Sequence, residues 1–250
     1  MRTYGLIGYP LKHSFSPGYF NKKFQRENIQ AEYKLFPIAS ISELPRIIEN
    51  HPSLSGLNVT IPYKEQVVDF LDDIRGDAEK INAVNTIVIQ HQNNSVKLIG
   101  YNTDTIGFQK SLQTHLSEQI KAALILGTGA TSKTVAWVLK RLNIGYTFVT
   151  RQKKGKQNYI AYEDLSPDII RQNKLIINTT PVGMYPDVDD FPSIIYDAIN
   201  EEHVVFDVIY NPPLTRFLSL CQRAGAKTIN GQKMLEYQAE ESWRLWNANQ

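Results

Sequence analysis

The feature that most constrains the fold lies at residues 122–150, AALILGTGATSKTVAWVLKRLNIGYTFVT. An apolar run leads into two glycines, an amphipathic stretch follows, and a second apolar run closes the segment. Continuous apolar runs are typical of strands covered on both faces, and their alternation with a helical pattern is typical of a βαβ unit. We therefore expect a parallel sheet with helices on both faces in this part of the chain.

The glycine turn between the first strand and the helix has the chemistry of a dinucleotide-binding loop. Gly127, Gly129 and Ser132 give the spacing G-x-G-x-x-S, with Ser at a position where Gly or Ala is usual. Glycines permit a tight turn and let backbone N–H groups approach a pyrophosphate at the helix N-terminus. A tight turn without a ligand is the alternative, but the strand before it and the helix after it favour nucleotide binding.

The second strand of this unit ends in a basic segment, which bears on the choice of nucleotide. In NAD-binding folds an acidic residue about 20 residues after the glycines binds the ribose 2′-hydroxyl. Here the strand ends TRQKKGK and contains no acid. A carboxylate repels a 2′-phosphate, whereas the Arg151 guanidinium can bind one with two hydrogen bonds. The sequence therefore predicts NADP, with Thr150, Lys153 and Lys154 beside Arg151; for the lysines, a solvated basic loop is the alternative.

The pattern of apolar and polar residues changes near residue 103, and we expect a domain boundary there. Before it, short strand-like runs alternate with helical patterns, including helices at 16–28, with Ser16 as N-cap, and at 63–73. After it, the runs KLIINTTPVGM and VVFDVIYNPP add buried strands. The sequence thus predicts an α/β protein with an N-terminal domain (1–103) containing a mostly parallel sheet, followed by a Rossmann-like domain (104–231).

Polar residues gather at the ends of the strands predicted before this boundary. They are Ser14, Ser16, Asn58, Thr60, Asn85, Thr86, Asn102, Thr103 and Asp104. Ligands of parallel sheets bind at such carboxyl ends, and a pocket of hydroxyls and amides suits a polyhydroxylated small acid. Each residue also has a structural alternative, since Ser16 or Thr103 suits a helix cap and Asn85 suits a turn before a strand.

The stretch GLNVTIPYKE places Lys64 in the first turn of the helix predicted at 63–73. Acidic residues are usual there, because the N–H groups of a helix start already carry partial positive charge. Either a solvated surface tolerates this lysine or the function uses it. Reduction of a ketone develops negative charge on the carbonyl oxygen, so it needs a proton donor and a group that holds the donor. Lys64 and Asp104 can supply both.

Composition argues against several other classes of protein. Lys and Arg number 27 against 25 Asp and Glu, and a net charge of +2 does not favour nucleic-acid binding. The single cysteine, Cys221, cannot form an intrachain disulfide, and the chain does not open on a signal peptide or a long apolar span. We expect a cytoplasmic monomer or homodimer with a buried thiol, a small-molecule substrate, no bound metal, and no nucleic-acid or membrane partner.

Eight separated motifs together resemble the shikimate dehydrogenase family. In order they are HSFSP, NVTIPYK, AVNT, YNTD, the glycine turn, INTTPVGM, FDVIYNP and NGQKMLEYQA, and they cover nearly the whole chain. The resemblance implies NADPH-dependent reduction of 3-dehydroshikimate to shikimate, with Lys64 and Asp104 as the catalytic pair. It implies that the substrate contacts Ser14, Ser16, Asn58, Thr60, Lys64, Asn85, Asp104, Tyr210 and Gln238. It implies that the cofactor contacts Gly127, Thr128, Gly129, Ala130, Thr131, Thr150, Arg151, Val208 and Gly231.

The same resemblance implies that the last helix, about 232–250, returns to complete the N-terminal domain, and that the hydride crosses a cleft between the domains. Two segments depart from the usual pattern of the family: GTGATSK stands for GAGGAS, and TRQ stands for Asn-Arg-Thr. These departures bear on cofactor affinity and not on the reaction. Two alternatives remain, a dehydrogenase of the same family acting on quinate or a related acid, and a non-catalytic NADP-binding regulatory module. The presence of both Lys64 and Asp104 argues against the second.

Overall fold

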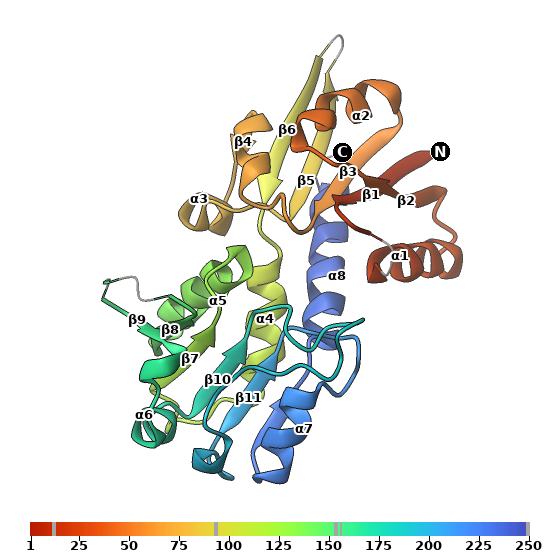
Figure 1. Cartoon of the computed structure of the whole chain (residues 1–250). Helices are drawn as coiled ribbons and strands as arrows, with labels where there is room; N and C mark the ends of the chain where they lie inside the picture. The colour runs from red at the N-terminus through yellow and green to blue at the C-terminus, as the bar shows by residue number, and fades with distance from the viewer. Residues whose placement is uncertain (12–13, 93–94, 153–154, 156, 249–250) are drawn as a thin grey trace. The chain divides into compact units, whose positions relative to one another are not determined.

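The computed structural model describes residues 1–11, 14–92, 95–152, 155 and 157–248. The chain divides into two compact units, one formed by Met1–Thr103 with Ala239–Gln250 and the other by Asp104–Gln238. The division follows Thr103 at one point and passes within the last helix at the other. As far as the chain is described, each unit is built on its own six-stranded sheet (Figure 1).

The sheet of the first unit is mixed, with the strand order β2-β1-β3-β5-β6-β4. Its strands are β1 (Arg2–Gly8), β2 (Ala31–Pro37), β3 (Leu54–Val59), β4 (Asp73–Ile74), β5 (Thr86–Gln92) and β6 (Ser95–Tyr101). Its helices are α1 (Phe15–Arg26), α2 (Leu44–Asn50), α3 (Asp77–Ile81) and the 3-10 helices η1 (Ile41–Glu43) and η2 (Gln66–Phe70). β1 pairs in parallel with β2 and β3, β4 pairs in parallel with β6, and β5 runs antiparallel to β3 and β6. The predicted mostly parallel sheet is confirmed, with one antiparallel hairpin, β5–β6.

Helices cover both faces of this first sheet (Figure 1). On one face, α1 and the end of α8 (Gln232–Ala248) enclose an aromatic cluster around Tyr4, Phe20 and Trp246. Trp246 is fully buried, and its indole N–H donates to the Ile87 carbonyl at 2.9 Å. A Cβ at Gly56 would lie 2.2 Å from the indole nitrogen, so glycine is required beneath the ring. The end of α8 is therefore part of the core of the first unit.

The first helix starts two residues earlier than the predicted N-cap requires. α1 begins at Phe15, so the N-cap position belongs to Ser14 and not to Ser16. The Ser14 hydroxyl makes no capping bond and instead donates to the Leu11 carbonyl at 2.9 Å. Ser16 is buried in the first turn, where its side chain hydrogen-bonds with Tyr33. The long-range contact with Tyr33 thus overrides the local capping preference that the sequence indicated.

Residues 63–73 do not form the predicted α-helix. Lys64 lies in a turn, and η2 follows it as a single short 3-10 helix. The Tyr63 hydroxyl donates to the Ile38 carbonyl at 2.7 Å, and Val67 is fully buried, so tertiary contacts fix the first half of the segment. β-branched residues such as Val67 and Val68 lose rotamer freedom in an α-helix, and short 3-10 helices are common connectors. Lys64 is therefore not in the first turn of an α-helix, and no α-helix dipole opposes its charge.

The second unit contains the predicted parallel sheet, and its strand pairings are all parallel within the described residues. Its strands are β7 (Ala122–Leu126), β8 (Gly145–Thr150), β9 (Tyr159–Ala161), β10 (Leu175–Asn178), β11 (Val204–Asp207) and β12 (Lys227–Ile229). Its helices are α4 (Asp104–Gln113), α5 (Ala130–Arg141), α6 (Pro167–Gln172), α7 (Arg216–Arg223), the 3-10 helices η3 (Tyr162–Asp164) and η4 (Tyr196–Ala198), and the start of α8.

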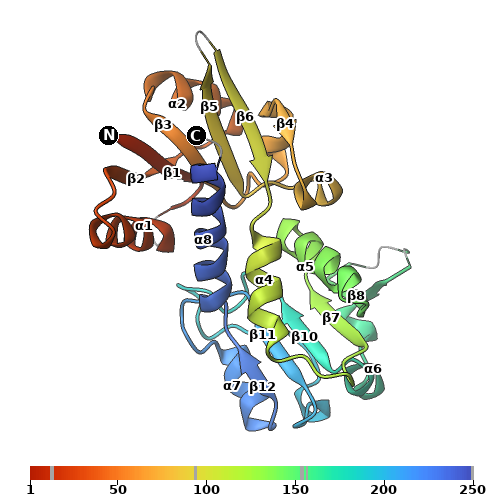
Figure 2. The same cartoon turned by 180° about the vertical axis from the view of Figure 1, so that it is seen from behind.

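The strand order of this sheet, β9-β8-β7-β10-β11-β12, is the 3-2-1-4-5-6 order of dinucleotide-binding folds. α4 and α5 cover one face, while α6 and α7 cover the other (Figures 1 and 2). The strand order reverses between β7 and β10, and ligands of such sheets bind outside the carboxyl ends of the strands at this point. The Rossmann-like prediction is confirmed.

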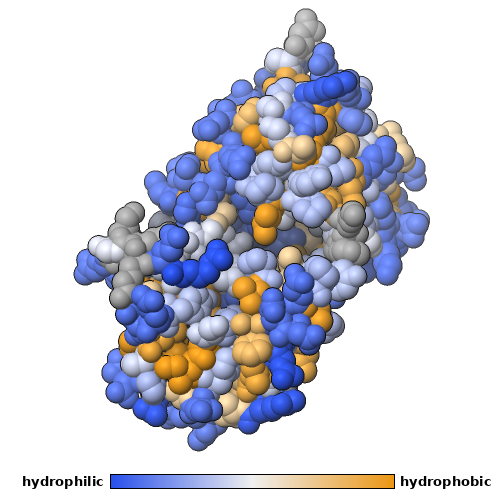
Figure 3. Space-filling view, in the orientation of Figure 1, coloured by the Kyte–Doolittle hydropathy of each residue, from blue (hydrophilic) through white to orange (hydrophobic). Residues whose placement is uncertain are grey.

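Polar side chains cover most of the face seen in Figure 3, with hydrophobic ones in small separate patches. In the part of the chain that the structure describes, no helix is both long and apolar enough to cross a membrane. Cys221 is fully buried in the second unit, as predicted, and burial raises the pKa of its thiol to about 12.

Candidate nucleotide and substrate sites

The glycine turn leads from β7 into α5, and glycine occurs at its two positions for different reasons. Gly127 has a φ of +109°, and a Cβ there would lie 3.0 Å from both Thr179 Oγ1 and Thr180 Cγ2. Gly129 has φ −83° and ψ −171°, which suit any residue, and a Cβ there would have no described atom within 4 Å. Neither backbone geometry nor packing explains this glycine. A ligand that closely approaches the backbone would explain it.

The N-terminus of α5 is suited to an anion. Gly129 is its N-cap residue, no side chain in the described chain caps it, and the first turn holds no acid. The first N–H groups of a helix lack intrahelical partners and carry partial positive charge, which favours a phosphate. Five predicted cofactor residues lie here: Gly127, Thr128 and Gly129 in the turn, and Ala130 and Thr131 in the first turn of α5.

Ser132 occupies the third position of the fingerprint and has a specific partner. It is fully buried, and its Oγ lies 2.7 Å from Thr179 Oγ1. Thr179 gives its own hydroxyl hydrogen to the Leu126 carbonyl at 2.6 Å, so Ser132 is the donor in its bond to Thr179. This chain of hydrogen bonds joins α5 to the loop after β10. Thr179 was not among the predicted site residues, although its place directly after a buried strand was a usable signal.

The predicted 2′-phosphate site begins at the end of β8. Thr150 is buried as the last residue of β8, and Arg151 is exposed directly after it. Because β8 pairs in parallel with β9, Arg151 and Tyr162 follow neighbouring strand ends. Burial raises the pKa of Tyr162 to about 12, and the nearby Arg151 charge opposes this rise. Lys153 and Lys154 lie outside the described residues.

Val208 and Gly231 meet at the other end of the same sheet edge. A Cβ at Gly231 would lie 2.1 Å from the Val208 carbonyl oxygen, so only glycine fits there. The Gly231 N–H donates to the Ile209 carbonyl at 3.0 Å, and the Val208 N–H donates to the Asn178 carbonyl at 3.0 Å. The loops after β10, β11 and β12 are therefore tied together. Tyr210, which is half-buried, belongs to the middle one of these loops.

In the first unit, Asn58 and Asn85 belong to a buried cluster of hydrogen-bonded side chains. Asn58 Oδ1 accepts a hydrogen bond from the Tyr33 hydroxyl at 2.8 Å. Asn58 Nδ2 donates to Ser242 Oγ at 3.0 Å, to Thr86 Oγ1 at 3.2 Å and to the Asn85 carbonyl at 3.3 Å. The cluster therefore links the end of β3, the start of β5 and the end of α8. Thr86 was among the polar residues predicted at the strand ends, whereas Ser242 was not predicted.

Thr60 and Lys64 lie in the segment that follows β3. The Thr60 N–H donates to the Ile7 carbonyl at 3.0 Å, which places Thr60 beside the end of β1. The Lys64 carbonyl accepts from the Val84 N–H at 2.7 Å, so the backbone of Lys64 lies next to the residue before Asn85. The structure thus brings Thr60, Lys64 and Asn85 to the same region of the first unit. Ser14 and Ser16 are at the start of α1.

Asp104 and Gln238 belong to the second unit, where both are buried. A Cβ at Gly107 would lie 2.6 Å from the Met234 carbonyl oxygen and 3.1 Å from Gln238 Cβ. The start of α4, which includes Asp104, therefore packs closely against α8. Gln238 Nε2 also donates to the Leu235 carbonyl at 3.1 Å. In the described part of the chain, no group of three or more His, Cys, Asp or Glu side chains is arranged to hold a metal ion.

Comparison with known proteins finds relatives that match nearly the whole chain. A family model described as the shikimate dehydrogenase substrate binding domain matches residues 6–87. A shikimate dehydrogenase (NADP(+)) of Methanococcus maripaludis (strain C6 / ATCC BAA-1332) is 40% identical over 258 residues, which cover 97% of this chain and 90% of that protein. The chain belongs to the shikimate dehydrogenase family.

Solved structures of the shikimate dehydrogenase family have the same fold as this chain. Shikimate dehydrogenase 1 from Peptoclostridium difficile matches with a TM-score of 0.86 and 37% identity, covering 100% of this chain and 93% of that one. Shikimate 5-dehydrogenase from Thermus thermophilus, in complex with NADP(H) and shikimate, matches with a TM-score of 0.86 and 28% identity, covering 99% and 94%. The predicted resemblance to the family is confirmed over both units.

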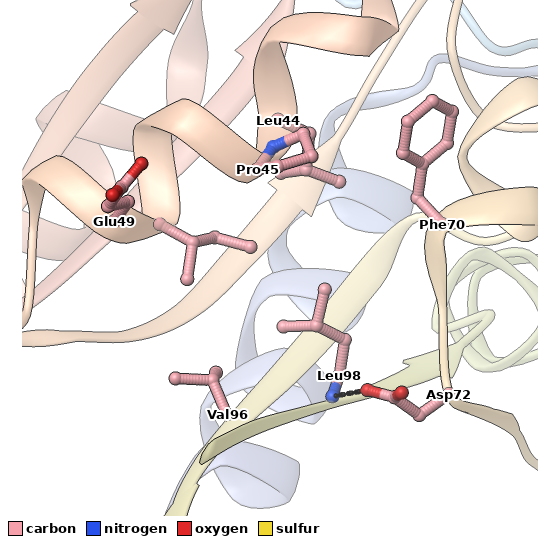
Figure 4. Close-up of a pocket in the computed structure, with 8 residues that line it drawn as sticks. Leu44, Pro45, Glu49, Phe70, Asp72, Val96 and Leu98 are labelled. Carbon is pink, nitrogen blue, oxygen red and sulfur yellow. Dashed lines mark hydrogen bonds between the residues drawn. The ribbon is translucent and has the colours of Figure 1, made fainter. Parts of the chain in front are cut away.

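A separate groove of about 460 Å³ lies on the first unit, apart from the shikimate dehydrogenase motifs. Its lining residues are Leu44, Pro45, Ile48, Glu49, Phe70, Asp72, Val96 and Leu98. Figure 4 shows residues from α2, from the end of η2 and from β6 around it, with the Asp72 carboxylate accepting the Leu98 N–H at 2.7 Å. None of the predicted site residues lines this groove.

Proposed function

We propose that the protein catalyses the reversible, NADPH-dependent reduction of 3-dehydroshikimate to shikimate. The observation that carries this proposal is the family match along nearly the whole chain, at 40% identity to a curated NADP(+) enzyme. The matched part of the chain includes the buried amide and hydroxyl cluster of the first unit as well as the open glycine turn of the second. A nucleotide-binding protein with an unrelated ligand would have no need of both.

NADP fits the residues of the second unit. The open backbone at Gly129 and the N-terminus of α5 suit a pyrophosphate, and the exposed Arg151 suits a 2′-phosphate. Val208 and Gly231 would lie along the nicotinamide half, and Lys153 and Lys154 would add positive charge near Arg151. When bound, NADPH supplies a hydride to the carbonyl carbon of the substrate.

Lys64 and Asp104 are the proposed acid/base pair. The Lys64 ammonium would give one proton to the carbonyl oxygen as negative charge develops there, and would take one back from the hydroxyl in the reverse direction. The Asp104 carboxylate would hold the ammonium in place by a charge-assisted hydrogen bond. Because Lys64 lies in a turn after β3 and not in a helix, its own backbone bond to Val84 fixes where the side chain starts.

The other predicted residues would bind the substrate and take no proton. Ser14, Ser16, Thr60, Tyr210 and Gln238 carry the hydroxyls and the amide that suit a carboxylate and ring hydroxyls. Asn58 Nδ2 already donates within the buried cluster, and Asn58 Oδ1 accepts from Tyr33, so the second lone pair of Oδ1 would meet a substrate hydroxyl. Asn85 would act beside it. A pocket of hydroxyls and amides beside one ammonium and one carboxylate selects a polyhydroxylated acid over an apolar one.

The proposal is tested by initial rates of NADPH formation from shikimate and NADP. Quinate replaces shikimate in a second series, and NAD replaces NADP in a third. We expect the highest kcat/KM with shikimate and NADP. A preference for quinate would support the alternative dehydrogenase, and binding of NADP without turnover of either acid would support the regulatory module.

We also infer a cytoplasmic location and a monomer or homodimer. A single buried thiol suits a reducing compartment, in which disulfides are rare. Light scattering after size-exclusion chromatography distinguishes the two oligomeric states, and fractionation of the source cells tests the location.

A further inference from the structure

Asp207 is the last residue of β11 and is fully buried although it carries an ionisable carboxyl group. Its Oδ1 accepts hydrogen bonds from Asn178 Nδ2 and from the Ile209 N–H, both at 3.1 Å. Its Oδ2 accepts from Thr215 Oγ1 at 2.7 Å. The three donors come from the end of β10, the loop after β11 and the N-cap of α7. Burying a carboxylate costs free energy unless the carboxylate is hydrogen-bonded. These three hydrogen bonds offset that cost for Asp207.

Each residue that donates to Asp207 also makes a hydrogen bond to another residue. Asn178 Oδ1 accepts from the N–H and the hydroxyl of Thr180, at 3.0 and 2.6 Å, which shapes the loop after β10. Thr215 Oγ1 accepts from the Leu218 N–H at 3.3 Å and so caps α7. The Ile209 carbonyl accepts from Gly231, as described above. One buried carboxylate is therefore common to the three segments that surround residues 208–213.

We propose that Asp207 is the positioning residue of the loop 208–213: its carboxylate fixes both ends of the loop that presents Val208 and Tyr210 to the ligands. The inference rests on the proposed function, because the ligand contacts of Val208 and Tyr210 come from it. Asp207 is fully buried, so it would itself touch neither ligand. It acts through the Ile209 N–H, one residue before Tyr210, and through Thr215 at the far end of the loop.

The charge of Asp207 is suited to this role near neutral pH. Burial raises the pKa of Asp207 to about 6, and the donors Thr215, Ile209 and Asn178 oppose the rise. Among the described residues, Cys221 of α7 and Tyr196 of η4 are the ionisable groups that interact electrostatically with Asp207. Burial raises the pKa of both groups. Both are neutral at neutral pH, so Asp207 is the group that changes charge in the mildly acidic range.

Protonation of Asp207 would place a hydrogen where a neighbour now donates one. The wild-type KM for shikimate should therefore rise as the pH falls through about 6. Asp207→Asn keeps the side-chain volume, removes the ionisable group and turns one acceptor into a donor. We expect the KM for shikimate to rise about 5- to 20-fold at neutral pH, with kcat within about two-fold, as for the loss of ground-state binding. The variant should also lose the rise of KM at acidic pH.

A second series separates loop positioning from the capping of α7. Thr215→Val removes both hydrogen bonds of the hydroxyl, whereas Thr215→Ser retains them. Ser166→Ala is the matched control, because Ser166 caps α6 by accepting from the Ile169 N–H at 3.3 Å. We expect a raised KM in Thr215→Val, a normal KM in Thr215→Ser, and a lower melting temperature with a normal KM in Ser166→Ala. An equal rise of KM in Thr215→Val and Ser166→Ala would overturn the proposal.

Amide hydrogen exchange of the ligand-free protein tests the positioning without turnover. Exchange in peptides covering 208–213 should be faster in Asp207→Asn than in the wild type, and unchanged in peptides covering β7 and α5. If wild-type protein does not turn over shikimate, the proposed function fails while this comparison still judges the loop. Unchanged exchange in 208–213, or a wild-type KM and pH profile in Asp207→Asn, would overturn the role given to Asp207.

Discussion

Ser132 at the start of α5 and Thr179 after β10 are joined by a hydrogen bond of 2.7 Å. The Thr179 hydroxyl in turn donates to the Leu126 carbonyl. The bond spans the position where the strand order reverses, and in sheets of this order a dinucleotide binds there. The usual Gly or Ala at the third position of the fingerprint serves close packing of helix and strand. Here a hydroxyl serves instead, by fixing the distance between the glycine turn and the neighbouring loop.

We predict that Ser132→Ala weakens NADPH binding about 3- to 10-fold, the effect of losing one neutral hydrogen bond. Ser111→Ala is the control, because the Ser111 hydroxyl is also buried but donates within its own helix, to the Gly107 carbonyl at 2.6 Å. Calorimetric titration with NADPH measures both variants. Equal losses of affinity in the two would show that the bond to Thr179 does not shape the nucleotide site.

Arg151→Ala should weaken NADP binding by about 1.5 to 3 kcal/mol, the size of a charge-assisted hydrogen bond, while NAD binding changes little. The reason is that only NADP carries the 2′-phosphate that a guanidinium would bind. Arg171→Ala is the control, since Arg171 pairs with Asp168 at 2.9 Å on α6. Dissociation constants for both nucleotides decide the matter, and an equal loss for NADP and NAD would contradict the assignment.

Lys64→Met should lower kcat with shikimate and saturating NADP by about 10² to 10⁴, the usual contribution of general acid/base catalysis. NADP affinity should not change. Stability should change little, because Lys64 lies in a turn and its backbone bond to Val84 is retained. Lys80→Met, at an exposed lysine of α3, provides the control. Turnover within a few-fold of wild type would make Lys64 a surface cation without a catalytic role.

Asp104→Asn should impair the same step as Lys64→Met. The double variant should therefore be far less impaired than the product of the two single effects, as for groups that act as a unit. The measurement is kcat for the wild type, both single variants and the double variant under one set of conditions. Multiplicative losses would mean that the two residues serve separate steps.

The raised pKa of Asp207 predicts how the free energy of unfolding depends on pH. Its carboxyl binds a proton more tightly in the folded state, where the pKa is about 6 compared with an ordinary value of 3.8. The corresponding stabilisation is complete below about pH 3.8 and is lost as the pH rises through about 6. At about 1.4 kcal/mol per pKa unit this amounts to roughly 3 kcal/mol.

Asp207→Asn should remove this dependence, so the variant should gain stability relative to wild type as the pH is raised from about 4 to about 7. Urea unfolding at several pH values measures the effect. Asp197→Asn, at an exposed site of the same unit, controls for the change in net charge. A constant difference between Asp207→Asn and wild type across this range would mean that Asp207 titrates normally.

The elements that could be predicted are those whose signals lie within short stretches of sequence. β7, α5 and β8 were predictable because apolar runs and two glycines lie within one segment. The failure at 63–73 has a long-range cause, since Tyr63 is anchored to Ile38. The partners of the site residues are more distant still: Ser132 and Thr179 are 47 positions apart, and Asn58 and Ser242 are 184 apart. No local pattern marks such a pairing, so the hydrogen-bonded clusters became visible only in the fold.

The position of Trp246 determines the order in which this protein can be completed during synthesis. The indole closes the core of the first unit over Gly56, and its partner Ile87 lies 159 positions earlier in the chain. A ribosome delivers that sheet long before it delivers the ring that covers it, whereas the second unit, Asp104–Gln238, emerges as one uninterrupted stretch. The second unit therefore has all its residues before the first unit does, although the first unit begins the polypeptide.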